Sequence, residues 1–390
     1  MPTMPQAFTG RSIDQSDELR MILDTVDRVF TRHFPAEEQR RRDKAHAPPY
    51  ELLPVLGEAG LIGLGFPEEY GGGGMPWSVV TRVSERMGYL GSMLGTLCDV
   101  TVTFGGMSLM AYASEAQRRE ILPRMIRGEV LFALALTEPG AGSDASRIRT
   151  RAVAVPGGWR INGRKIWSSY AGDATYMVTP CRTSGEPGQS RGLTMMLIPP
   201  TAKGVHMTQL DKVGNNGLTS WDIGLEDVFV PEADVLGEVD RGFRNLMSTL
   251  HYARAGLAAS ATGQAQKAVD LAIAHAKERE QFGQPIGKFQ VIQHRLADMQ
   301  MRVDQSRLYT HHLADLISAG APCRREAAQA KVIATECLQY VTHHGMQILA
   351  SAGYHADSDM QRIWRDARLY TFGEGSNEIQ RNIIARELGL

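Results

Sequence analysis

Apolar residues recur at helical spacing through the first third of the chain. Within residues 17–34 they stand three, four and seven positions apart, which predicts one apolar helix face: Leu19, Ile22, Leu23, Val26, Val29 and Phe30. A second helix is expected to begin after Pro48-Pro49 and to end at Gly60, since glycine is common at helix C-termini. Helical structure is expected from about residue 14 to residue 130.

Between residues 131 and 240 the apolar pattern changes to a period of two. Residues 150–169 predict three strands, with turns at Pro156-Gly157-Gly158 and at Asn162-Gly163. Further strands are expected over three segments: 175–180, 193–200 and 222–231. Short strands separated by turns are typical of a small antiparallel sandwich or barrel.

Helical spacing returns after about residue 241 in three long segments: 258–277, 292–316 and 326–351. Long helices with short connections indicate an antiparallel bundle. We therefore expect a helical domain over 1–130, a β domain over 131–240 and a helical bundle over 241–390. This order excludes a doubly wound nucleotide-binding fold, and no G-x-G-x-x-G motif lies between a strand and a helix.

The charge balance argues against several classes of function. Lys and Arg total 42 and Asp and Glu total 43, so a nucleic-acid binder or a polybasic membrane-surface protein is not expected. The weakly polar stretch 93–112 contains Asp99, so no membrane span is expected there. Residues 1–10 lack the basic start and apolar run of a secretory signal. The four cysteines are far apart and form no CxxC pair, which favours a cytoplasmic protein without disulfides or bound metal: Cys98, Cys181, Cys323 and Cys337.

Two segments of the middle region carry candidate cofactor contacts. In Leu136–Asp144, Gly142 would let the backbone approach a ligand, and Thr137 and Ser143 supply hydroxyl groups. A tight interdomain loop is the alternative. Farther along, Trp167 precedes two serines, Ser168 and Ser169, and so offers an aromatic wall beside small polar groups, as a flat cofactor requires. A core tryptophan is the alternative there.

Two segments of the last region also carry candidate chemistry. Within residues 278–290, Arg279 could pair with a phosphate and Phe282 could pack on an adenine, unless the segment is only a solvated helix end. Near the C-terminus, Glu374 stands between Gly373 and Gly375, at a break between two helical stretches. In dry surroundings such a carboxylate has a raised pKa and can act as a base, whereas on the surface it would have no role.

Taken together, these segments resemble the acyl-CoA dehydrogenase family of flavoproteins. The resemblance runs from the N-terminal helices through GFPEEYGG, LTEPGAGSD and FGEGSNEIQR to the final IIARELGL, which is nearly the whole chain. It implies an α+β fold with an N-terminal helical domain, a middle β domain and a C-terminal four-helix bundle. It also implies bound FAD.

The resemblance assigns cofactor roles to named positions. Leu136 to Ser143 would lie along the flavin ring and pyrophosphate, with Thr137 bonding the ring edge. Trp167 would stack beside the flavin, and Ser169, where the family more often has threonine, would place its hydroxyl near N5. Further FAD contacts, some of them to the FAD of a neighbouring subunit, are implied for Gly142, Ser168, Arg279, Gln281, Phe282, Gln290, Gln347, Ser351, Ser376 and Glu378. A shared FAD implies at least a homodimer, and a homotetramer is usual in the family.

Glu374 matches the family's commonest catalytic base. Some members place the base on an earlier helix, directly before an arginine, but here Ala253 precedes the matching Arg254 and cannot accept a proton. The positions expected beside the substrate are Ser143, His251, Tyr252, Arg254 and Gly375. Gly373 replaces an aromatic residue that many fatty-acyl enzymes have, which predicts a pocket for a branched or functionalised acyl group.

The implied reaction is α,β-dehydrogenation of an acyl-CoA to the trans-2-enoyl thioester. Glu374 would remove the α proton, the β hydrogen would leave as hydride to flavin N5, and an electron-transfer flavoprotein would accept the electrons. One alternative keeps this chemistry but takes the acyl group from a carrier protein. A flavin oxidase or monooxygenase on the same fold, and a silent binding protein, are further alternatives.

Overall fold

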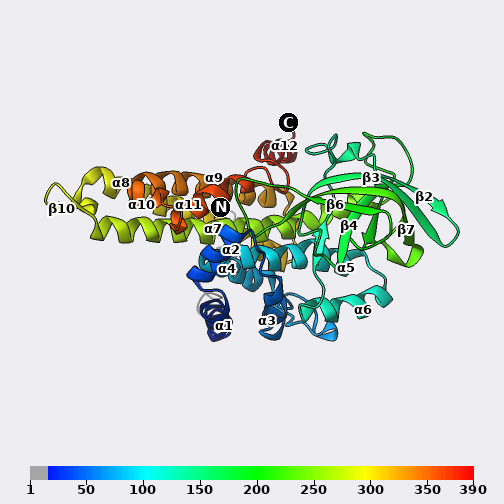
Figure 1. The fold of residues 1–390 in the computed structure, drawn as a ribbon, viewed down its shortest axis with the longest axis horizontal. Coiled ribbons are helices and arrows are strands. Elements are labelled where there is room, and N and C mark those ends of the chain that lie inside the picture. The colour runs from blue at the N-terminus through cyan, green and yellow to red at the C-terminus, as the bar shows by residue number, and fades with distance from the viewer. Residues whose placement is uncertain (1–15) are drawn as a thin grey trace, which may run out of the picture.

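The computed structural model describes residues 16–390, and residues 1–10, where no secretory signal is expected, lie outside that range. The helices are α1 (Asp17–His33), α2 (Ala36–Ala45), α3 (Leu53–Glu58), α4 (Trp77–Val100), α5 (Met107–Tyr112), α6 (Glu115–Ile126), α7 (Gly242–Glu278), α8 (Gln290–Ser318), α9 (Arg324–Leu349), α10 (Ser351–Tyr354), α11 (Asp359–Tyr370) and α12 (Asn377–Glu387). The strands are β1 (Phe132–Leu134), β2 (Arg151–Val155), β3 (Gly158–Ser169), β4 (Tyr176–Arg182), β5 (Leu193–Ile198), β6 (Val205–Gln209), β7 (Ser220–Pro231), β8 (Val235–Leu236), β9 (Glu280–Gln281) and β10 (Gln284–Pro285). The expected order of helices, sheet and helices is confirmed, with the sheet at one end of the molecule and the long helices extending from it (Figure 1).

The middle region forms one eight-stranded sheet in the order β6-β7-β3-β2-β4-β5-β8, with β1 beside β4. Its pairs are antiparallel apart from β1–β4 and a single β2–β4 pair. The turn expected at Asn162-Gly163 is wrong, because β3 continues through both residues and only shifts register against β7. The Asn162 side chain accepts a bond from the Asp227 N–H (2.9 Å), and a Cβ on Gly163 would lie 2.5 Å from the Thr150 hydroxyl. The extra residue of this bulge lies on β7, where Glu226 and Asp227 stand opposite Asn162, so β3 continues past it.

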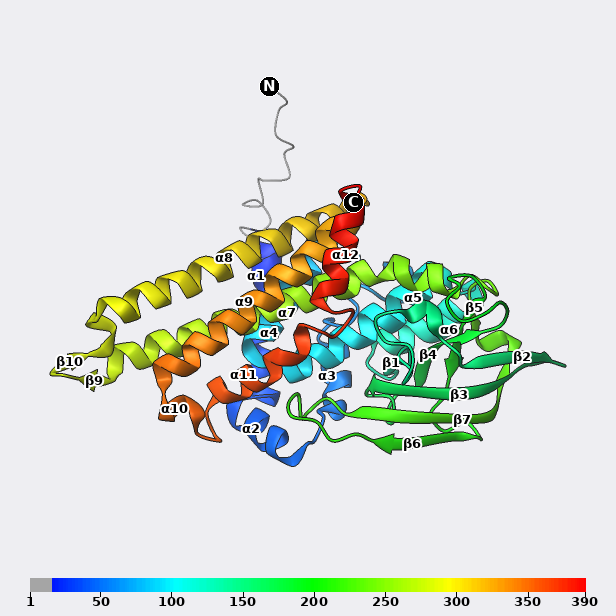
Figure 2. The ribbon, with the colours of Figure 1, turned by 90° about the horizontal axis from the view of Figure 1, so that it is seen from above.

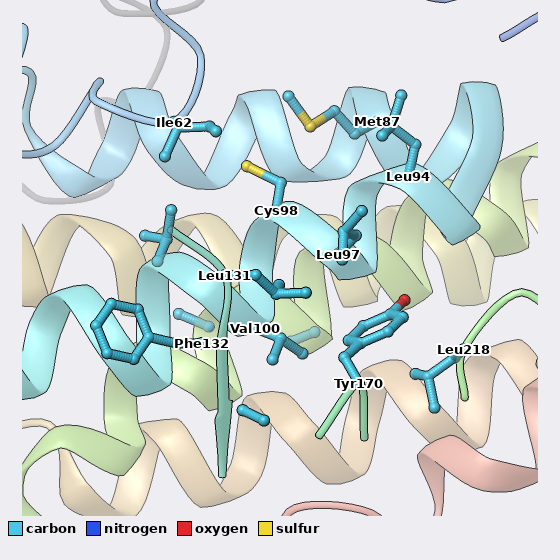
Figure 3. Packing of buried hydrophobic residues seen from close by; sticks show 14 of the residues in the cluster. Ile62, Met87, Leu94, Leu97, Cys98, Val100, Leu131, Phe132, Tyr170 and Leu218 are labelled. Carbon is cyan, nitrogen blue, oxygen red and sulfur yellow. The ribbon is translucent and has the colours of Figure 1, made fainter. Parts of the chain in front are cut away.

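Helix α4 folds back on itself at Gly91. The backbone is non-helical there (φ 179°, ψ 92°), and the Gln39 side chain donates to the Leu90 carbonyl (2.8 Å). Ser84 and Asp99 lie on opposite sides of this break and are hydrogen bonded at 2.9 Å. In a straight helix, fifteen residues would separate them by about 22 Å. The two arms of α4 therefore lie side by side, as the positions of Met87, Leu97 and Cys98 show in Figure 3.

The longest helix, α7, connects the sheet with the far end of the bundle. It packs on α4, α8 and α9 and also contacts β5. Helix α8 runs antiparallel to both α7 and α9, and the β9–β10 hairpin joins α7 to α8 at the end away from the sheet (Figure 2). Functional groups carried near the two ends of α7 are thus held far apart by a single rigid element.

The helical run Trp77–Tyr112 is long and apolar enough, by those criteria alone, to cross a membrane. However, 72% of its most apolar window is buried within the protein. Burial of this kind is what the packing of α4 against α7 and α8 produces, and it makes this run a core element of the fold.

Close packing of α4 on α7 depends on glycine. A Cβ on Gly88 would lie 2.5 Å from the Ser260 carbonyl oxygen, a backbone atom that cannot move independently. We expect Gly88→Ala to lower the free energy of unfolding by about 1–3 kcal/mol, because the added methyl group overpacks the helix pair. Thermal unfolding of the FAD-loaded protein measures the loss.

Gly95→Ala is the matched control in the same helix. Its Cβ would lie 3.1 Å from the Met87 Cβ and no closer than 3.6 Å to backbone atoms, a much weaker clash than at Gly88, and alanine gains roughly 1 kcal/mol of helix propensity over glycine. We expect this variant to unfold close to the wild-type temperature. Equal losses for the two variants would contradict the proposed role of the Gly88 contact.

Candidate active site

The loop after β1 is held by a buried ion pair. Lys165 on β3 donates to the Glu138 carboxylate (2.9 Å) and to the Pro180 and Leu136 carbonyls (2.9 and 3.3 Å). Glu138 also accepts the backbone N–H groups of Arg149 (2.7 Å) and Thr150 (2.9 Å). Burial disfavours the ionised carboxylate, but the Lys165 charge and these hydrogen bonds lower the pKa of Glu138. The pair fixes both ends of the loop that contains Leu136–Ser143.

This loop presents open backbone at its tip. Gly140, Gly142 and Ser143 are exposed, and a Cβ on either glycine would meet nothing within 4 Å. The Thr137 carbonyl accepts the Ile166 N–H (2.8 Å), so the loop lies directly against the end of β3. The two segments proposed from the sequence as cofactor contacts are therefore adjacent.

Trp167 occupies a strained position beside this loop. Its φ is +61°, a conformation that is a rare exception for a bulky residue, and its side chain is 55% exposed. The alternative of a core tryptophan is therefore wrong: the register shift between Lys165 and Ser168 turns the indole out of the sheet. The neighbouring Ser168 hydroxyl is buried without a hydrogen-bond partner. An outward aromatic ring, a bare glycine loop and an unpaired hydroxyl fit a flat, phosphate-bearing cofactor such as FAD.

Glu374 lies in a strained loop between α11 and α12. Its φ is +55°. The Gln380 side chain donates to the carbonyls of Glu374 (3.3 Å) and Gly375 (3.0 Å). Beneath the loop, buried Lys331 donates to the Thr371 carbonyl (3.1 Å) and to the side chain of Asn377 (2.8 Å). These bonds over-determine the loop and so hold the glutamate in a conformation that it rarely adopts.

The Glu374 carboxyl group is placed for proton transfer. Its Oε2 is buried and has no hydrogen-bond partner. Burial raises the pKa of Glu374 to about 7, although the charges of Lys331 and Arg254 oppose the increase, and the charge of Asp99 adds to it. A carboxyl group with a pKa near 7 is a competent base at neutral pH. The alternative of a surface glutamate is therefore excluded.

Arg254 lies close enough to Glu374 to influence its charge. Arg254 is buried, with 6% of its surface exposed, and its Nε has no hydrogen-bond partner among the described residues. Burial lowers the pKa of Arg254 to about 10. His251 and Tyr252 precede Arg254 on α7, and their ring centroids are 4.0 Å apart. The Tyr252 ring centroid lies 4.6 Å from that of Trp77. Burial lowers the pKa of His251, which favours the neutral imidazole. Packing therefore accounts for Tyr252, while Arg254 retains an unused donor.

The remaining candidate residues fall into two groups. Ser376 caps α12 by accepting the Ile379 N–H (3.4 Å), and Glu378 is exposed in the first turn of that helix. The others are exposed at the far end of the bundle, around the β9–β10 hairpin and the end of α9: Arg279, Gln281, Phe282, Gln290, Gln347 and Ser351. Within one chain, Leu136–Ser143, Trp167–Ser169 and Glu374 therefore lie in one region. The six residues around the hairpin and the end of α9, called the hairpin group below, lie in another.

The sequence analysis missed Glu138, Lys165 and Lys331 as residues that hold the site. A lysine within an amphipathic helix or an alternating strand gives no signal that it is buried, since exposed lysines fit the same patterns. Their partners are also distant in sequence, as with Lys331 and Asn377. Among residues 16–390 no group of three or more metal-ligating side chains occurs.

Comparison with known proteins identifies the family that shares this arrangement. Models of the acyl-CoA dehydrogenase N-terminal, middle and C-terminal domains match residues 16–129, 133–228 and 240–389. The chain is 35% identical to the probable acyl-CoA dehydrogenase YngJ of Bacillus subtilis, over 97% of this chain and 99% of that one. It is 33% identical to the human mitochondrial short-chain specific acyl-CoA dehydrogenase, over 97% and 92%.

A solved structure shows the same likeness. Butyryl-CoA dehydrogenase from Megasphaera elsdenii superposes with a TM-score of 0.92 at 30% identity, covering 96% of this chain and 99% of that one. The matched domains span almost all of residues 16–390, and they include the Trp167 wall and the Glu374 loop. The chain therefore belongs to the acyl-CoA dehydrogenase family and is an FAD-dependent oxidoreductase that acts on CH–CH groups of acyl thioesters.

Proposed function

We propose that Glu374 is the base of an acyl-thioester α,β-dehydrogenase. The observation that carries this proposal is the buried, unpartnered Oε2 of Glu374, whose pKa burial raises to about 7. FAD, when bound, supplies the acceptor for the hydride that leaves Cβ. Glu374 takes the proton from Cα, and the product is the trans-2-enoyl thioester.

Residues of this chain also orient the substrate in the proposed reaction. The Glu374 N–H donates no backbone hydrogen bond within the described part of the chain, so it is free to donate to the thioester carbonyl oxygen. Such a donor stabilises the enolate-like charge that develops as the α proton leaves. The alternative position of the base, directly before Arg254, holds Ala253, which cannot accept a proton. Glu374 is therefore the one candidate base at these two positions.

We also propose that the FAD site is completed by a second copy of the chain, in a homodimer or homotetramer. From Arg254 to Arg279 the chain follows α7 for 25 residues, which corresponds to about 38 Å. The hairpin group thus cannot reach the cofactor held beside Trp167 in its own chain. Phe282 at the hairpin tip is 93% exposed, as expected of a residue that contacts another subunit. An electron-transfer flavoprotein is the proposed electron acceptor.

The test of the proposed reaction is anaerobic bleaching of the flavin. We expect a thioester substrate to bleach the wild-type protein, and Glu374→Gln to keep FAD while turnover falls by about 10²–10⁴-fold, the usual contribution of a general base. Each acyl group is presented both on CoA and on a carrier protein, which separates the two substrate carriers. Glu186→Gln, an exposed glutamate in the β domain, is the control. A Glu374→Gln protein that still bleaches at the wild-type rate would rule out this base.

The pH dependence follows from the same carboxyl group. Below its pKa of about 7, Glu374 is protonated and cannot accept a proton, so kcat/KM should rise between pH 6 and pH 8. Lys331, whose pKa burial lowers to about 8, is still charged where Glu374 titrates, and its charge lowers the pKa of Glu374. We expect Lys331→Met to move the rise to higher pH.

Lys203→Met, which removes an exposed lysine from a loop of the β domain, is the matched control for this measurement. Its profile should coincide with that of the wild type. A Lys331→Met profile that stayed in place or moved to lower pH would contradict the electrostatic coupling between Lys331 and Glu374.

Gly373 is proposed to set the width of the acyl pocket. Its backbone is not left-handed, and a Cβ there would meet only the Leu369 carbonyl oxygen, at 3.3 Å, so a larger side chain can be accommodated. We expect Gly373→Leu to lower kcat/KM for branched acyl thioesters by about 10-fold or more relative to short straight ones, since single methylene groups change such ratios by 10–200-fold. Gly373→Ala should leave the ratio nearly unchanged. The proposed pocket is wrong if Gly373→Leu also leaves it unchanged.

A further inference from the structure

A second carboxylate, that of the partly buried Asp99, lies close to the candidate base. The Ser84 hydroxyl donates to its Oδ1 (2.9 Å) from the other arm of α4, and a Cβ on Gly256 of α7 would stand 3.5 Å from its Cγ. Asp99 is near enough to Glu374 and to Tyr170 that its charge raises the pKa of both groups. Asp99 therefore lies on α4 where this helix contacts α7, close to the candidate base.

No basic side chain neutralises Asp99. Among the residues that the structure describes, no lysine, arginine or histidine forms an ion pair with it, and the Ser84 hydroxyl is its one side-chain donor. The cavity of about 20 Å³ that borders Asp99 has room for roughly one water molecule, and its walls are apolar apart from Ser84 and Asp99 themselves. Burial raises the pKa of Asp99 to about 6, so it is mostly ionised at neutral pH. Desolvation of a carboxylate that has no cation beside it costs free energy, so a cationic ligand would complement it.

A second polar group near Asp99 also lacks a partner. The Tyr170 side chain is 0% exposed, and its hydroxyl makes no hydrogen bond in the described structure. Figure 3 shows Tyr170 extending towards the part of α4 that carries Leu97 and Val100. Its φ of +59° is a conformation that non-glycine residues seldom adopt, so the backbone is held in an unfavourable state that turns the ring to this place. An unpaired hydroxyl this deeply buried indicates a polar ligand atom nearby.

We propose that the acyl group oxidised by this protein carries a cationic nitrogen, which binds the Asp99 carboxylate with the Tyr170 hydroxyl beside it. This inference rests on the proposed function, because it places the nitrogen on the acyl chain beyond the bond that is oxidised. A plain hydrocarbon chain would leave Asp99 desolvated and unpaired, and an acyl chain ending in a carboxylate would be repelled. Gly256 has no side chain that would cover the carboxylate, since a Cβ there would stand 3.5 Å from the Asp99 Cγ.

The test compares acyl thioesters that differ only in this charge. The dimethylammonium substrates are 4-(dimethylamino)butyryl and 5-(dimethylamino)pentanoyl thioesters, which cannot cyclise to lactams. Their uncharged isosteres are 5-methylhexanoyl and 6-methylheptanoyl thioesters. We expect at least one charged substrate to have a kcat/KM on the order of 10- to 100-fold above its isostere, the usual range for a charge-assisted hydrogen bond. Each acyl group is supplied on CoA and on a carrier protein.

The Asp99→Asn variant identifies the residue responsible. The amide keeps the shape of the carboxylate and can still accept the Ser84 hydroxyl, so FAD content should stay at the wild-type level. We expect this variant to lose the preference for the charged substrate while it continues to oxidise the isostere. Asp270→Asn is the matched control: Asp270 is a half-buried aspartate on α7 that accepts the Tyr89 hydroxyl (2.9 Å), and its substitution should leave the preference in place.

The outcomes separate this inference from the proposed function. If the wild type oxidises the isosteres equally well or better, the cationic subsite is wrong while the dehydrogenase proposal stands, and this comparison needs no variant to fold. If Asp99→Asn retains the full preference, Asp99 is not the residue that binds the cation, and the inference fails. If no thioester on either carrier bleaches the flavin, both proposals fall together.

Discussion

The ion pair between Glu138 and Lys165 is the interaction on which the cofactor region depends. Lys165 is fully buried and bonds three acceptors from two different segments, and Glu138 accepts two backbone N–H groups in addition. Every charged atom of the pair therefore has partners, which is the condition under which a buried ion pair is tolerated. Because its acceptors lie in the loop after β1 and in β4, the pair joins the open glycine tip to β3, the strand that carries Trp167. Loss of either partner would leave the other as an unpaired buried charge.

The loop that carries Glu374 follows the same principle on the other side of the candidate site. Lys331 and Asn377 bind the loop from below, and Gln380 binds it from α12. These bonds allow Glu374 to keep a left-handed backbone with an unpaired carboxyl oxygen. In both places, buried polar side chains with several hydrogen-bond partners support a neighbour that is strained and incompletely bonded. The strained residues of the candidate site are thus held by hydrogen bonds from neighbouring elements.

Much of this could be predicted from the sequence. Helical and alternating periodicities predicted the order of helices, sheet and helices, and the motifs identified the family and FAD, all of which are confirmed. Local chemistry misled at two points: Asn162-Gly163 is a strong turn signal that the pairing of β3 with β7 overrides, and Trp167 is turned outward by a register shift. The roles of individual site residues, Glu374 included, remain predictions.

The rest could not be predicted because it depends on contacts between distant segments. Lys331 meets Asn377 across 46 residues, and Asp99 meets Ser84 only because α4 folds back at Gly91. In the sequence, Asp99 is simply a polar interruption of a weakly polar stretch. Nothing in that pattern shows that its carboxyl group lies in an apolar setting without a cation, since this follows from the path of the helix.

The outward indole of Trp167 has a kinetic consequence for assembly of the holoenzyme. Its unfavourable backbone angle is imposed by the β3–β7 register, so the ring is already in place before any cofactor arrives. A backbone fixed in this way loses little conformational entropy on contact with a ligand. The cofactor should then bind to a preformed surface. Its association rate should be set by diffusional encounter and by the removal of water, without a slow folding step in the β domain.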